Sequence, residues 1–102
     1  MISNKLIIAY NKAVENINRA VAKEIDSFDI DFERVAQYFY IFIRDEKYEA
    51  VIIKHQNKYN YDIKIFSTND NIIYAAAFKF NEFTGKSKIY EVHQLLEVLW
   101  KR

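Results

Sequence analysis

The sequence predicts an α+β fold, a two-layer sandwich in which a mainly antiparallel four-stranded sheet packs against a long N-terminal helix and a C-terminal helix. Two observations lead to this prediction. Apolar residues recur at helical spacing near both ends of the chain, and four runs rich in β-branched and aromatic residues lie between them. The expected order is therefore α-β-β-β-β-α, in a single domain that spans residues 1–102.

Residues 4–28 are expected to form the N-terminal helix. Their apolar side chains recur every three or four positions, which is the spacing of one face of a helix, and charged residues fall outside that face. Ser3 or Asn4 can cap the start of the helix, because a side-chain oxygen there can accept a bond from a free backbone N–H. We interpret residues 29–35 as a connector. The expected apolar face consists of Leu6, Tyr10, Ala13, Val14, Ile17, Val21, Ile25 and Phe28.

The four expected strands are residues 36–44, 48–55, 61–66 and 72–80. They are dense in Ile, Val, Tyr and Phe, which favour strands. The polar segment "RDEK" between the first two is short enough for a hairpin. Since the chain contains no proline and only one glycine, its turns are expected to use Asn, Asp and Ser.

The single glycine lies in "TGKS", which ends like a phosphate-binding loop. The full motif G-x-x-x-x-G-K-[ST] requires another glycine five positions before Gly85, and that position holds Phe80. We therefore expect Gly85 to provide a positive φ angle in a turn. Ser87 is expected to cap a last helix, whose apolar face would comprise Ile89, Val92, Leu95, Leu96 and Leu99.

Composition excludes several kinds of function. The formal net charge is +1, so no global field attracts the protein to nucleic acid or to anionic lipid. The chain has no cysteine, which removes disulfides, thiol nucleophiles and cysteine-ligated zinc. The longest apolar runs, "YFYIFI" and "IIYAAAF", are far shorter than the ~20 residues of a membrane-spanning helix. We expect a cytoplasmic protein that contacts no membrane and needs no cofactor or metal.

Side-chain alternation predicts a tyrosine-rich surface on the sheet. It places Tyr38, Tyr40 and Phe42 on one side of the first strand, and the more aliphatic side is expected to meet the helices. Tyrosine combines a large contact area with few torsions and a polar tip, and it is enriched in protein interfaces. The residues expected to bind a partner are Tyr38, Tyr40, Tyr48, Lys54, Lys58, Tyr59, Tyr61 and Lys64.

The sheet edges raise a separate expectation. In a simple meander the first and fourth strands would be the edges, and these two are the most apolar of the four. An apolar edge invites pairing with another chain. The sequence therefore predicts either a different strand order or edge pairing with a partner, including a second copy of the chain in a homodimer.

One alternative function is a magnesium-dependent nuclease. An acidic residue on the first helix (Glu15 or Glu24), followed by Asp45 and by the Asp62-x-Lys64 triplet, resembles the PD-(D/E)xK nucleases. In that family the carboxylates hold Mg²⁺ and the lysine orients the attacking water, which this resemblance would imply here. Alternating charge on a half-exposed strand also produces Asp-x-Lys without any catalytic role.

A second alternative is binding of single-stranded nucleic acid. Basic residues interleave with aromatic ones around the middle strands, and such a pattern can follow phosphates and stack bases. The residues are Lys47, Lys54, His55, Lys58, Tyr59, Tyr61 and Lys64. Acidic residues lie among them and cancel much of their charge.

The two histidines of the chain, His55 and His93, are far apart in the sequence and do not predict a metal site. No catalytic residue is assigned, and we expect a non-enzymatic protein that binds another protein. The abundance of Ile, Lys, Asn, Tyr and Phe, whose codons are rich in A and T, is typical of a gene from an AT-rich genome or a mobile element. By analogy, the function expected is that of an inhibitor, either a toxin-immunity or a phage anti-defence protein, which acts by steric occlusion.

Overall fold

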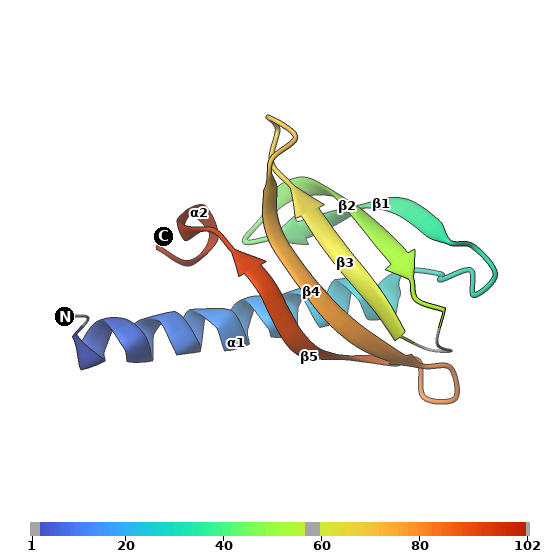
Figure 1. The fold of residues 1–102 in the computed structure, drawn as a ribbon, viewed down its shortest axis with the longest axis horizontal. Coiled ribbons are helices and arrows are strands. Elements are labelled where there is room, and N and C mark those ends of the chain that lie inside the picture. The colour runs from blue at the N-terminus through green and yellow to red at the C-terminus, as the bar shows by residue number, and fades with distance from the viewer. Residues whose placement is uncertain (1–2, 57–59, 102) are drawn as a thin grey trace.

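The computed structural model describes residues 3–56 and 60–101, and it has an α+β fold (Figure 1). The sheet is antiparallel, with the strand order β1-β2-β3-β4-β5 of a simple meander. The elements are α1 (Asn4–Ser27), β1 (Ala36–Ile43), β2 (Glu46–Lys54), β3 (Asn60–Phe66), β4 (Ile72–Asn81), β5 (Lys86–Leu95) and α2 (Glu97–Trp100).

Helix α1 begins where the sequence predicts. The Ser3 hydroxyl accepts a hydrogen bond from the Leu6 N–H at 3.2 Å, which satisfies one of the free donors of the first turn. The buried positions of the helix recur at every fourth residue and face the sheet: Ala13, Ile17, Val21 and Ile25. The N-terminal turns of α1 extend beyond the sheet (Figure 1), and the apolar side chains there are exposed.

The core lies between α1 and one face of the sheet. The backbone of α1 is closest to the two edge strands, β1 and β5, so the sheet curves around the helix. Large side chains from the middle strands fill the space between them, among them Tyr61, Ile63, Tyr74 and Phe78, all fully buried. We call this the inner face of the sheet and the opposite one the outer face.

A tight turn joins β1 to β2. Only Arg44 and Asp45 separate Ile43 from its partner Glu46, and both turn residues have positive φ angles, 53° and 65°. Two-residue hairpins favour this left-handed geometry because it matches the twist of the strands. The expected four-residue break is therefore a two-residue turn, and β2 begins at Glu46.

A C-terminal helix is present, but only as the short α2. The expectations that it begins at residue 88 and that the sheet has four strands are wrong, because residues 86–95 form a fifth strand, β5. The register between β4 and β5 shifts twice, so that Tyr90 and His93 are extra residues in bulges. Each bulge lengthens the spacing between inward-facing residues from two to three, which places Ile89, Val92 and Leu95 on the inner face. This spacing of three imitates that of a helix.

The structure of the turn before β5 confirms one of the two predictions made for it from the sequence. Gly85 has a φ angle of +69°, as predicted, and its N–H donates to the Asn81 carbonyl at 2.8 Å. The prediction that Ser87 caps a helix is wrong, because Ser87 lies in β5. Its backbone N–H donates instead to the Asp26 carboxylate near the end of α1.

Candidate functional site

Three aromatic side chains form an exposed stripe on the outer face of β1. Tyr38, Tyr40 and Phe42 are 80%, 57% and 50% exposed, respectively. They alternate with inward-facing residues along an eight-residue strand, so the chain presents them together on the side of the sheet away from α1. We call these three residues the aromatic stripe.

Tyr40 stands between two adjoining hollows in the outer face. One has a volume of about 510 Å³ and the other of about 380 Å³, and both are lined by Tyr40, Glu49, Phe66 and Asp70. Tyr40, Glu49 and Phe66 are cross-strand neighbours in one row of the sheet, from β1 through β2 to β3. Asp70 comes from the β3–β4 turn, where its φ angle is 61°. The register of the strands and this turn thus assemble the hollows.

The two hollows differ in charge. The charged residues that line the larger hollow are Glu49 and Asp70, both acidic. The smaller hollow also contains Lys47, whose Nζ lies 4.0 Å from the centroid of the Tyr40 ring. One side of the Tyr40 ring is therefore taken by a cation of the same chain, while the larger hollow combines aromatic walls with carboxylates. Such a surface suits a basic or amphipathic side chain.

Two other tyrosines of the sequence-predicted set have side chains on the inner face, although one of them, Tyr48, also lines the smaller hollow. Tyr61 is fully buried and stacks on Phe78 with ring centroids 5.4 Å apart. Tyr48 is on the inner face, where it packs against the core and its hydroxyl donates to Glu46 Oε2 at 2.7 Å. Tyr61 therefore has no exposed side chain, whereas Tyr48 is only partly buried, and contact of either tyrosine with a partner stays a prediction. The two-residue turn before β2 determines which residues of that strand face inward, and it places Tyr48 opposite the buried Ile41.

The predicted lysines also differ in position: one contacts its own chain and another lies on the outer face. Lys54 binds its own chain, with its Nζ donating to the Phe32 carbonyl, so it anchors the connector between α1 and β1. Lys64 lies on the outer face, half-buried between Val51 and Ala75 in neighbouring strands. The predicted residues Lys58 and Tyr59 lie outside the described residues.

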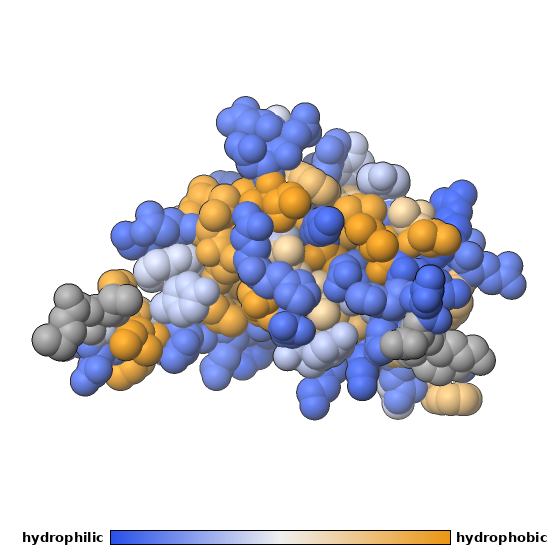
Figure 2. All heavy atoms as spheres, in the orientation of Figure 1, coloured by the Kyte–Doolittle hydropathy of each residue, from blue (hydrophilic) through white to orange (hydrophobic). Residues whose placement is uncertain are grey.

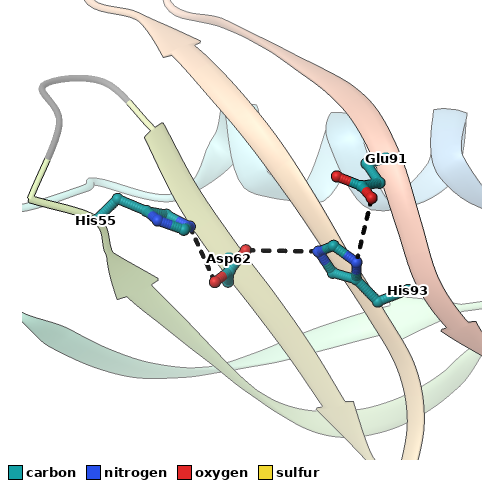
Figure 3. Close-up of polar contacts among 4 residues, drawn as sticks. All are labelled: His55, Asp62, Glu91 and His93. Carbon is teal, nitrogen blue, oxygen red and sulfur yellow. Dashed lines mark ion pairs between the residues drawn. The ribbon is translucent and has the colours of Figure 1, made fainter.

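The outer face also carries a cluster of ionisable side chains that the sequence did not predict (Figure 3). Its members are His55, Asp62, Glu91 and His93. Asp62 of β3 lies between two histidines, with His55 Nε2 at 2.9 Å from Oδ2 and His93 Nε2 at 3.8 Å from Oδ1. The contact with His55 is close but lacks hydrogen-bond geometry. His93 Nδ1 is also 3.8 Å from Glu91 Oε1. The side chains of Asp62 and His93 can meet because the strand between them carries Ala77, the cross-strand neighbour of Asp62.

This cluster could not be predicted from sequence spacing, because only the pairing of the strands brings its residues together. His55 follows β2 and His93 is a bulge residue of β5, so no spacing along the chain relates them. Their side chains are 41% and 45% exposed, and ion pairs at such exposure contribute little to stability. Within residues 3–56 and 60–101, no group of three or more His, Asp and Glu side chains could hold a metal ion.

The structure does not bring together the residues of the nuclease alternative. Asp62 is paired across the sheet with Ile53, whereas Asp45 lies in the turn at the other end of β2. Ile53 lies eight positions after Asp45 along the extended strand, which corresponds to about 26 Å. Asp45 therefore cannot share a metal ion with Asp62 and Lys64.

The projecting end of α1 lies near α2 (Figure 1), and it carries a second apolar surface (Figure 2). Tyr10 makes an edge-on contact with Trp100 there, with ring centroids 5.2 Å apart. The exposed apolar residues of this helix-end patch are Leu6, Ile7, Ile8, Leu96 and Val98. In the part of the chain that the structure describes, no helix combines the length and apolarity needed to cross a membrane.

Comparison with known proteins assigns neither a family nor a relative. No protein-family model matches the chain, and searches of curated proteins and of solved structures find no significant match.

Proposed function

We propose that this chain is a non-enzymatic binding protein that recognises another protein through the aromatic stripe and the larger of the two hollows. The observation that carries the proposal is the position of Tyr40, a rigid exposed ring that forms a wall of both hollows. Exposed aromatic rings that border hollows are the usual anchors of protein interfaces, because they bury much area at a small entropic cost. The action proposed is that of an inhibitor of the immunity or anti-defence kind, which occludes the active surface of its partner.

The charges of the larger hollow favour a protein over a nucleic acid. Glu49 and Asp70 are its charged residues, and both would repel a phosphate backbone. Lys47, which lines the smaller hollow, already lies over the Tyr40 ring. The same arrangement attracts a cationic side chain, and arginine suits it best because its planar guanidinium can stack on Tyr40 while it donates to a carboxylate.

Capture of a partner tests this proposal. The protein is immobilised and incubated with lysate of the source cell, and the retained proteins are identified by mass spectrometry. Three variants are compared with the wild type: Tyr40→Ser and Phe66→Ser, which alter the hollow, and Phe83→Ser as a matched control. Phe83 is an aromatic residue that is 92% exposed at the β4–β5 turn, distant in sequence from the hollow. Thermal melting of each variant establishes that it is folded.

The supporting result is a protein that the wild type and Phe83→Ser retain, and that both hollow variants lose. Its activity should then fall when wild-type protein is added, and remain when Tyr40→Ser is added. Retention that depends on Ile8 in the helix-end patch, and not on Tyr40, would overturn the proposed site. Tight binding of a single-stranded oligonucleotide that depends on Lys64 would favour the nucleic-acid alternative instead.

A further inference from the structure

The backbone of β1 presents unpaired groups beneath the aromatic stripe. The Lys54 N–H donates to the Val35 carbonyl at 2.8 Å, which identifies this pair as a hydrogen-bonded one. Hydrogen-bonded and non-bonded pairs alternate along an antiparallel ladder, so Tyr38, Tyr40 and Phe42 belong to non-bonded pairs. Their N–H and C=O groups therefore point away from β2, toward the open edge of the sheet.

The opposite edge of the same sheet is protected. Strand β5 carries charged residues, among them Lys86, Lys88 and Glu91, and it contains two bulges. In addition, one of its N–H groups, that of Ser87, already donates to Asp26. Charges, bulges and local capping are the devices by which proteins prevent edge-to-edge association. Strand β1, with the sequence AQYFYIFI, has no charge and no proline, its ladder to β2 runs without a register shift, and no contact among the described residues binds the outward groups of the stripe.

We propose that a second copy of the chain occupies this edge, with the two β1 strands antiparallel across a two-fold axis at Tyr40. Tyr40 would pair with Tyr40 of the other copy, and Tyr38 with Phe42 in both directions. Each pair exchanges two backbone hydrogen bonds, about six in all. Each of these three pairs places one aromatic ring opposite another, a favourable cross-strand combination, and β1 carries no charge that could oppose a like charge.

The self-complementarity of the aromatic stripe indicates that the partner at the β1 edge is a second copy of the chain. The residues of the aromatic stripe lie at Tyr40 and two positions to either side, so a two-fold antiparallel pairing about Tyr40 places each stripe ring opposite another stripe ring. The expectation that the fourth strand is an edge of the sheet is wrong, because β5 pairs with β4 and is itself the edge strand. The dimer would join two sheets into one and place two aromatic stripes side by side on its outer face. It goes beyond the proposed function and does not depend on it.

Sedimentation equilibrium of the full chain over a wide concentration range tests the dimer. The wild type should dimerise, and Tyr40→Lys should weaken dimerisation about tenfold or more, because two like charges then face each other across the axis. Tyr40→Glu should do the same for the same reason. A mixture of the two variants should recover the dimer, since the two introduced charges are then opposite. Tyr90→Lys, a matched change of an exposed tyrosine on β5, should leave the association unchanged.

The results separate the two proposals. A wild-type chain that stays monomeric at every concentration overturns the dimer, as does a dimer that survives Tyr40→Lys or is lost in Ile8→Glu alone. Phe66→Ser lies two strands away from the edge and should keep the dimer while it loses the captured partner. Partner capture by a strictly monomeric protein would therefore contradict only the inference about the edge.

Discussion

The hydroxyl of Tyr74 donates a hydrogen bond of 2.6 Å to Oδ1 of Asn18, which ties the fourth strand to the middle of α1. A second tyrosine of the core, Tyr61 on the neighbouring strand, is equally buried, but its hydroxyl finds no hydrogen-bond partner among the described residues. The two side chains have the same chemistry and the same inner face. They differ in whether the buried hydroxyl is satisfied, and this difference predicts opposite effects of the same substitution.

Tyr74→Phe should lower the free energy of unfolding by about 1 kcal/mol, because it removes a buried hydrogen bond and leaves the Asn18 amide without its partner. Tyr61→Phe should leave stability unchanged or raise it slightly, because it removes a buried hydroxyl that makes no bond. Urea denaturation of the two variants and the wild type measures both effects. Equal destabilisation by the two substitutions would show that the hydroxyl of Tyr61 is satisfied in solution.

Stability should fall in alkaline solution, and Tyr74 should account for part of the fall. Burial raises the pKa of Tyr74 well above its usual value of 10.0. As the pH rises through 10, the unfolded chain releases this proton while the folded chain retains it, so the free energy of unfolding decreases. The contribution of this group is complete below pH 10 and is lost above it. Tyr61, whose pKa is raised by burial and further by the Glu82 carboxylate, should act in the same direction.

Denaturation curves recorded at a series of pH values from neutral to strongly alkaline test this point. Tyr74→Phe should show a shallower decline than the wild type, because the residue that replaces Tyr74 does not titrate. Lysine deprotonation affects both proteins alike and cancels in the comparison. Parallel declines would contradict the assignment to Tyr74.

Much of the fold follows from local patterns in the sequence. Helix α1, the four strands after it and the positive φ of Gly85 were predictable because periodicity and turn chemistry act over a few residues. Strand β5 was not, because its two bulges give inward-facing residues a spacing of three. A single-sequence pattern cannot distinguish that spacing from a helical one, since the bulges are defined by the partner strand.

The exposed residues of the candidate site were predictable only where the alternation of side chains within one strand determines them. The exposure of Tyr38 and Tyr40 follows from alternation within β1, as expected. The partial burial of Tyr48 depends on the length of a turn, and the full burial of Tyr61 depends on which side chains fill the middle of the core, so both are tertiary properties. The same holds for Asp62 and His93, which meet across a third strand.

Arg44 should be a site at which the protein can be stabilised. Its φ angle of 53° places a residue with a Cβ in the left-handed region, which asparagine and glycine tolerate better. Arg44→Asn should therefore raise the free energy of unfolding by about 1 kcal/mol. Arg34→Asn is the matched control, because Arg34 is also exposed but has no positive φ, and it should produce no gain. Chemical denaturation measures both, and an equal gain would trace the effect to loss of positive charge.

Plasmid DNA incubated with the protein and Mg²⁺ should remain intact. Cleavage by the chemistry of the nuclease alternative requires carboxylates that share one metal ion, and Asp45 and Asp62 are held near opposite ends of β2. Agarose gel electrophoresis of supercoiled plasmid detects even single cuts. Lys64→Ala, with Lys79→Ala as a matched change on the next strand, distinguishes cleavage by this protein from a contaminating nuclease. Cutting that only Lys64→Ala abolishes would establish a metal site built around Asp62, and it would replace the non-enzymatic function proposed for this chain.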